Sequence, residues 1–193
     1  MKEQLPIPIE QYLLLSVLCF GNDFMPNLAM FSLRESGYDR ALQLYQNCKK
    51  PNLLTPEGRK TFLNCAAVGE LQVLRERIML RKRPEEKTLM KDPKLFKKKF
   101  NLHILDNASP QKVSEAFWKT FHWTLEYFTT SLAPNWDWVY PYADAPLITD
   151  LVSFPDTSVM ERNPLNFTLV NQLQFILPHK SLRKAKKLIL FPD

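Results

Sequence analysis

Five prolines lie between residues 132 and 165 and set this stretch apart from the rest of the sequence. Proline fixes φ and removes a backbone hydrogen-bond donor, so no continuous helix can run through this stretch. The five positions are Pro134, Pro141, Pro146, Pro155 and Pro164. The same stretch carries two tryptophans and two tyrosines close together, Trp136, Trp138, Tyr140 and Tyr142. We therefore expect an ordered loop that its aromatic rings hold against the rest of the protein.

The segments around this loop have helical periodicity. Apolar residues recur at helical spacing, and no run of alternating apolar and polar residues indicates a strand. The expected helices span residues 10–20, 36–48, 61–82, 110–130 and 163–177. The first is apolar all round, which predicts burial on all sides, and Ser109-Pro110 suits the start of the fourth. The predicted fold class is mostly α, with one long ordered aromatic, Pro-rich loop.

The composition excludes several protein classes. A hydrophobic share of 45% supports a core and argues against a wholly disordered chain. The only cysteines, Cys19, Cys48 and Cys65, lack the C-x-x-C spacing of a zinc ribbon or redox motif. An odd number of thiols favours a reducing, intracellular compartment, either cytoplasmic or nuclear. The apolar run at residues 12–20 is about half the roughly 20 residues of a membrane span, so we expect no membrane partner.

Positive charge is concentrated in two segments. Residues 75–99 carry a net charge of +7 and residues 180–187 carry +5, while the whole chain carries +6. Basic clusters suit a polyanion such as RNA, because each neutralised phosphate releases counterions. The candidate contacts in the first segment are Lys97, Lys98 and Lys99. A solvated helix face or a flexible charged loop is the alternative interpretation.

A turn sequence follows the first expected helix. Residues 21–26 read Gly-Asn-Asp-Phe-Met-Pro. Gly21 and Asn22 allow a sharp turn that presents Asp23 at the end of a buried element, where its carboxylate could bind a hard cation. The alternative is that Asp23 only caps the next turn. Metal-dependent hydrolysis of a phosphodiester normally needs several carboxylates, so Asp23 cannot form such a centre alone.

The aromatic residues between positions 121 and 151 also have two interpretations. Aromatic faces stack on unpaired bases, which contributes roughly 1–3 kcal/mol per base. The alternative is that these rings are core residues.

Together, these motifs resemble the XRN-type 5′-to-3′ exoribonucleases. That family carries Gly-Asn-Asp-Phe-Leu-Pro after a hydrophobic helix, and residues 21–26 match it with Met25 in place of Leu. The family's Trp-x-Trp block is matched by Trp136, Trp138, Tyr140, Pro141, Tyr142, Ala145, Pro146, Asp150 and Leu151. Its Gln-Leu…Leu-Pro…Ser segment is matched by Gln172, Leu173, Leu177, Pro178 and Ser181. The resemblance spans nearly the whole chain.

The resemblance implies the helical C-terminal part of a nuclease region, without its N-terminal α/β half. We expect one partial domain with sub-regions 9–50, 51–108 and 109–193. The implied activity is Mg²⁺- or Mn²⁺-dependent hydrolysis of RNA with a 5′-monophosphate, with Asp23 as a catalytic metal ligand. The other acidic ligands would come from an N-terminal half in the same or another chain. Trp136 or Trp138 would stack on the RNA, with Gly21, Asn22, Tyr140 and Tyr142 in support.

One departure from the family pattern favours a different function. Where the family has Tyr-His-Tyr-Ala-Pro, this chain has Tyr142-Ala143-Asp144-Ala145-Pro146. The change removes an imidazole and adds a carboxylate. The added negative charge weakens binding of nucleic-acid phosphates nearby. The alternative function is therefore a non-catalytic RNA-binding or structural subunit of a larger assembly. A third interpretation is a fragment that does not fold alone.

Overall fold

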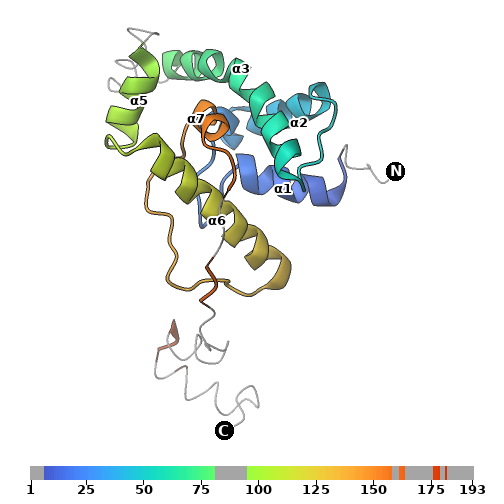
Figure 1. Ribbon diagram of the computed structural model, residues 1–193, viewed down its shortest axis with the longest axis vertical. Coiled ribbons are helices and arrows are strands. Elements are labelled where there is room, and N and C mark those ends of the chain that lie inside the picture. Colours follow the sequence, from blue (N-terminus) through green and yellow to red (C-terminus); the bar gives the residue numbers. More distant parts are fainter. Residues whose placement is uncertain (1–6, 81–94, 158–160, 164–175, 179–180, 182–193) are drawn as a thin grey trace.

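The computed structural model describes residues 7–80, 95–157, 161–163, 176–178 and 181 (Figure 1). The described part contains six α-helices and two short 3₁₀ helices. Its one strand-like feature is an isolated bridge between Asn135 and Asn163. The prediction of a mostly helical fold is confirmed. No helix of this part has the length and apolar composition needed to cross a membrane.

The helices of the described part are listed here in chain order. They are α1 (Ile9–Cys19), η1 (Ala29–Phe31), η2 (Leu33–Glu35), α2 (Gly37–Asn47), α3 (Pro56–Leu80), α5 (Phe96–Ile104), α6 (Pro110–Thr130) and α7 (Ile148–Ser153). Figure 1 shows α7 between the long helices α3 and α6, and α7 contacts both. α1 packs against α6. The helix expected at 163–177 and the basic segment at 180–187 lie almost wholly outside the described residues.

Two apolar clusters form the core. The larger one joins α1, α2, α3, α6 and α7, and its fully buried members include Leu15, Phe62, Phe117, Trp118 and Phe121. Full burial of each such side chain contributes about 1.5–3 kcal/mol. The smaller cluster joins α5 to the neighbouring ends of α3 and α6, through Leu74, Phe96, Phe100, Leu105, Val113 and Leu147.

The Pro-rich loop is fixed to α6 by indole hydrogen bonds. Trp123 Nε1 donates to the carbonyl of Asn135 at 2.7 Å. Trp118 Nε1 donates to the carbonyl of Phe154 at 3.1 Å, beyond α7. Each bond pairs an indole N–H with a backbone carbonyl. Without it, both groups would be buried away from water with no hydrogen-bond partner. The expected ordered loop is present, and hydrogen bonds from two tryptophans of α6 hold it in place.

Burial of α1 differs from the prediction. Only its second half is buried, at Leu14, Leu15, Val17, Leu18 and Cys19. Ile9 in its first turn is 59% exposed. The expectation of burial on all sides is wrong for the first half, because part of it faces an open groove described below.

The start of α3 also differs from the prediction. The helix expected at 61–82 begins five residues earlier, at Pro56. Pro56 suits the first helical position, where no backbone donor is needed, and Thr55 Oγ1 accepts a hydrogen bond from Gly58 N at 3.1 Å. A Cβ at Gly58 would lie 1.8 Å from the carbonyl oxygen of Asn52, so this close approach requires glycine.

A short helix, α7, interrupts the segment expected to be loop. Its N-terminus is capped by a side chain from α3, since Glu70 accepts hydrogen bonds from Ile148 N at 2.6 Å and Thr149 N at 3.1 Å. Glu70 is buried. Burial raises the pKa of Glu70 to about 7, the negative charge of Asp150 adds to the rise, and the two backbone N–H groups oppose it. α7 therefore depends on a carboxyl group that titrates near neutral pH.

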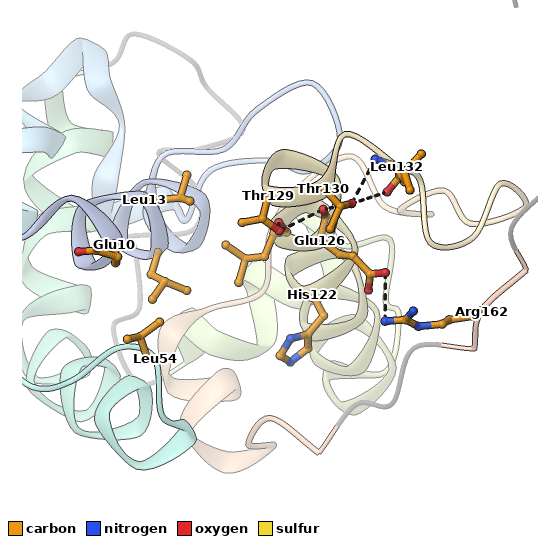
Figure 2. Close-up of a pocket in the computed structure, with 11 residues that line it drawn as sticks. Glu10, Leu13, Leu54, His122, Glu126, Thr129, Thr130, Leu132 and Arg162 are labelled. Atoms are coloured by element: carbon orange, nitrogen blue, oxygen red, sulfur yellow. Dashed lines mark hydrogen bonds and ion pairs between the residues drawn. The ribbon is translucent and has the colours of Figure 1, made fainter. Parts of the chain in front are cut away.

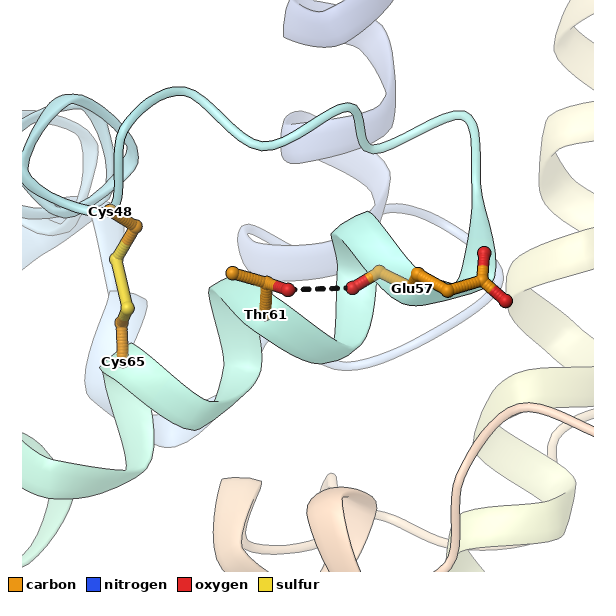
Figure 3. The surroundings of a disulfide bond; sticks show 4 residues. All are labelled: Cys48, Glu57, Thr61 and Cys65. Atoms are coloured by element: carbon orange, nitrogen blue, oxygen red, sulfur yellow. Dashed lines mark hydrogen bonds between the residues drawn. A yellow bond between two sulfur atoms is a disulfide. The ribbon is translucent and has the colours of Figure 1, made fainter.

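The cysteines are not equivalent in the fold. Cys48, directly after α2, and Cys65, in α3, form a disulfide, while Cys19 is buried and free (Figure 3). Their spacing in the sequence indicated no redox motif, because the pairing is made by the packing of two helices.

The raised pKa of Glu70 predicts a specific pH dependence of stability. The pKa is about 7 in the folded chain and 4.5 in the unfolded chain. The contribution of protonated Glu70 to the free energy of unfolding is therefore complete below pH 4.5, and it is lost as the pH rises through 7. We expect the free energy of unfolding to fall by about 3 kcal/mol over this range. Denaturant unfolding at a series of pH values measures it.

Glu70→Gln should remove most of this pH dependence, because the amide does not titrate. Glu76→Gln, at an exposed position of the same helix, is the matched control and should leave the dependence intact. An equally steep dependence in Glu70→Gln would contradict the assignment.

Candidate functional site

The turn at residues 21–26 has a fixed backbone geometry. Gly21 has φ of +71°, and a Cβ there would lie 2.5 Å from Asn27 N, so glycine is required. Asn22 N donates to the carbonyl of Met25 at 2.9 Å, and Asn22 Oδ1 accepts from Phe24 N at 2.9 Å. Asp23 lies at the exposed tip of this turn. The turn predicted from the sequence is present, and Gly21 and Asn22 support it.

Phe24 anchors the turn to α6. Its ring centroid lies 4.8 Å from that of Trp123, 5.2 Å from that of Tyr127 and 6.2 Å from that of Phe128. Trp123 and Tyr127 also stack on each other, with centroids 5.4 Å apart. Aromatic pairs in such geometry contribute about 0.5–1.5 kcal/mol beyond area burial. The carboxylate of Asp23 is thereby held next to a rigid aromatic cluster.

Asp23 shares a small pocket with the aromatic loop. The pocket has a volume of about 110 Å³, and its lining residues are Asp23, Phe24, Thr120, Trp123, Trp138, Val139 and Tyr140. Two motifs separated by more than one hundred residues thus meet at one place. Of the two candidate tryptophans, Trp138 lines this pocket, whereas Trp136 is 39% exposed beside the bridge between Asn135 and Asn163.

Two neighbouring residues of α6 hold Trp138. Its Nε1 donates to Thr120 Oγ1 at 3.0 Å. The Lys119 ammonium lies 4.1 Å from the centroid of the indole ring, which is within cation–π range. Sequence reasoning missed Lys119, which it read only as part of an aromatic helix. Lys119 directly precedes Thr120, which faces the loop. The role of Lys119 can therefore be recognised only when the position of the loop is known.

Tyr140 and Tyr142 support the loop from within. Tyr140 is buried, and its hydroxyl donates to the carbonyl of Asp144 at 3.0 Å. Burial, with smaller contributions from Tyr142 and Asp144, raises the pKa of Tyr140 well above its ordinary value. The two tyrosine rings contact edge to face, with centroids 5.6 Å apart. The Asp144 side chain is exposed.

The three predicted RNA-contacting lysines differ in their surroundings. All lie in the first half of α5, between the buried residues Phe96 and Phe100. Lys97 pairs with Asp150 of α7, whose side chain is only 4% exposed. Lys98 is exposed and Lys99 is partly buried. Lys97 therefore joins α5 to α7, and the RNA contacts of Lys98 and Lys99 stay predictions.

A second, larger hollow lies between α1 and α6 (Figure 2). Its volume is about 880 Å³, and its apolar lining comprises Leu13, Leu14, Leu54, Leu125 and Leu132. Glu126 at its rim pairs with Arg162 at 3.2 Å. None of the predicted site residues lines it.

A buried charge cluster borders this groove. His122 Nε2 donates to Asp156 at 2.8 Å, and Arg59 pairs with the same carboxylate at 2.6 Å. Burial alone would raise the pKa of Asp156, but the hydrogen bonds and charges of His122 and Arg59 outweigh it and lower the pKa. The cluster joins α3, α6 and the chain after α7, so its role in the described structure is to hold these elements together.

The described residues do not hold a divalent metal by themselves. No group of three or more histidine, cysteine, aspartate or glutamate residues in the described ranges is placed to bind one. Asp23 supplies a single carboxylate, whereas Mg²⁺ prefers an octahedral shell of oxygen ligands.

Comparisons with known proteins point to one family. Residues 91–188 match the family model described as the Xrn1 helical domain. The chain is 30% identical over 86 residues to 5′-3′ exoribonuclease 2 of Aspergillus oryzae, covering 45% of this chain and 8% of that protein. The proteins of that name from Cryptococcus neoformans and Chaetomium globosum are 28% and 29% identical, with the same coverage. The matched segment is a small part of these relatives.

The packing of Phe24 predicts that its removal will release the turn. We expect Phe24→Ala to lower the free energy of unfolding by about 3 kcal/mol, because a ring in contact with three aromatic rings is lost. Denaturant unfolding measures this change. Phe128→Ala is the control, since Phe128 belongs to the same cluster but is 45% exposed, and it should cost less than half as much. Equal losses would show that Phe24 does not anchor the turn.

Proposed function

The chain belongs to the Xrn1 helical domain family, and from this membership we propose that it is part of a 5′-to-3′ exoribonuclease-like protein acting on RNA with a 5′-monophosphate. The single observation that carries the proposal is the pocket that Asp23 shares with Trp138. In this pocket a carboxylate that could bind a metal ion lies near an aromatic ring that could stack on a base. The described helices would form one partial domain of that protein, inside the cell.

Asp23 would serve as one ligand of a Mg²⁺ or Mn²⁺ ion. The remaining carboxylates would come from an N-terminal nuclease half, in the same or another chain. The ion would supply the activation of water and the neutralisation of phosphate charge. The residues of this chain would position that carboxylate, through the Gly21 turn and the Phe24 anchor.

Trp138 would bind the RNA by stacking on a base. Its ring is held by Thr120 and Lys119, so little rotational freedom is lost when a base stacks on it. The Lys119 ammonium beside the ring would offer a positive charge to the adjacent phosphate. Tyr140 and Tyr142 would keep the loop in place rather than contact the RNA.

A second candidate function is a non-catalytic RNA-binding or structural subunit. Asp144 favours it, because this exposed carboxylate, two residues after Tyr142, would repel the phosphates of an RNA substrate. In this function the aromatic pocket would bind RNA without turnover.

Activity measurements separate the two functions. The substrate is single-stranded RNA with a 5′-monophosphate, and it is incubated in Mg²⁺ with the chain alone and with its candidate N-terminal partner. The exonuclease proposal expects hydrolysis by the pair only, with a loss of at least 100-fold in Asp23→Asn. RNA binding by the pair without hydrolysis would establish the second function. Failure to bind RNA at all would contradict the exonuclease proposal and an RNA-binding role, and would leave only the structural role.

Trp138→Ala should weaken RNA binding by roughly 5- to 100-fold, because one stacking contact is lost. Trp136→Ala is the matched control, two residues away on the same loop, and should change affinity less than threefold. Fluorescence anisotropy with a labelled 5′-phosphorylated RNA measures both. A larger effect at Trp136 would reverse the assignment of the stacking residue.

Lys119→Gln should weaken RNA binding and lower the slope of log affinity against log salt by roughly one phosphate contact. Lys112→Gln, at an exposed position of the same helix, controls for net charge. Equal changes in the two variants would show that Lys119 contributes only to the overall charge.

A further inference from the structure

Two cysteines close the loop between α2 and α3. Cys48 is the residue after the end of α2, and Cys65 lies in the third turn of α3, with Cα atoms 6.4 Å apart (Figure 3). This separation is within the range that a disulfide spans without backbone movement. The bond therefore joins two helices whose positions are already set by packing.

We propose that Cys48 and Cys65 form a reversible redox site, in which the disulfide forms and opens with the thiol–disulfide balance around the protein. Both residues are only partly buried, so a small reagent can reach them, whereas Cys19 has no exposed surface. An exchanging disulfide needs such access, and a purely structural one is usually enclosed.

The surroundings of Cys48 favour the reactive form of its thiol. Lys49 and Lys50 follow it directly, and both are exposed with left-handed backbone conformations. Positive charge beside a cysteine stabilises the thiolate, which is the nucleophile in exchange. The proposal therefore assigns the first attack to Cys48 and the completion of the bond to Cys65.

The reaction needs a low-molecular-weight disulfide such as oxidised glutathione. The Cys48 thiolate attacks one glutathione sulfur, which forms a mixed disulfide and releases one glutathione thiolate. The Cys65 thiolate then attacks the Cys48 sulfur and releases the second. The protein loses two electrons and two protons, and one glutathione disulfide becomes two glutathione thiols.

The loop that this bond closes also holds α1. Gln11 Nε2 donates to Asn52 Oδ1 at 2.8 Å, and Leu53 N donates to Gln11 Oε1 at 2.7 Å. Arg59 donates to the carbonyls of Leu53 and Leu54 at 3.0 and 3.2 Å. Because α1 leads directly into the Gly21 turn, oxidation would stabilise the element that carries Asp23. This consequence concerns stability and is independent of RNA hydrolysis.

The test counts thiols in the 193-residue chain after equilibration in glutathione buffers of graded ratio. The samples are quenched, denatured and labelled with a maleimide, and mass spectrometry counts the labels. We expect three labels in reducing buffers and one in oxidising buffers, with a transition independent of protein concentration. The oxidised form should unfold roughly 6–12 °C above the reduced form, because the closed loop restricts the unfolded chain.

Three variants make the result specific. Cys48→Ser and Cys65→Ser should each lose the transition and the thermal shift, whereas Cys19→Ala should keep both and show no label when oxidised. Three labels at every glutathione ratio would overturn the proposal, since no bond forms. A single label in millimolar reduced glutathione alone would also overturn it, since the bond would then be permanent. The reduced wild-type chain remains informative if a variant does not fold.

Discussion

The hydrogen bonds that the indole rings of α6 donate to the chain beyond it are the interaction on which the candidate site depends. Trp123 holds the loop at Asn135, and Trp118 holds the chain after α7 at Phe154. The same Trp123 ring packs on Phe24. One buried aromatic helix therefore fixes both walls of the pocket, the turn with Asp23 on one side and the loop with Trp138 on the other. Both bonds are buried or partly buried, so breaking either leaves an unpaired donor and acceptor.

Local signals in the sequence are sufficient to place most helices. The bounds of α6 agree with the prediction, because Pro110 fits the first turn and Ser131 ends the helix in a left-handed conformation, although the Ser109 side chain makes no capping bond. α7 has no such local signal. Its cap is Glu70, which lies 78 residues earlier, and the surrounding prolines indicate only a loop. The missed disulfide has the same cause, since two packed helices bring its cysteines together.

The candidate site is predictable to a similar degree. Gly21 and Asn22 define the turn by their own conformational preferences, so the exposed position of Asp23 follows from a few adjacent residues. The choice between Trp136 and Trp138 does not, because both belong to one Trp-x-Trp motif and are distinguished by what the folded loop brings near each ring. Charge is the least predictable property. A run of three lysines gives no sign that Lys97 pairs with Asp150 while Lys98 stays exposed.

The cap that Glu70 provides for α7 also bears on how the chain folds. A helix of six residues is too short to persist alone, because nucleation costs more than so few hydrogen bonds return. We therefore expect α7 to form after α3 has reached it, a step that closes a long stretch of chain and is entropically slow. The Pro-rich loop would therefore become ordered late, after α3 and α6 have docked, and until then its aromatic side chains would remain open to solvent.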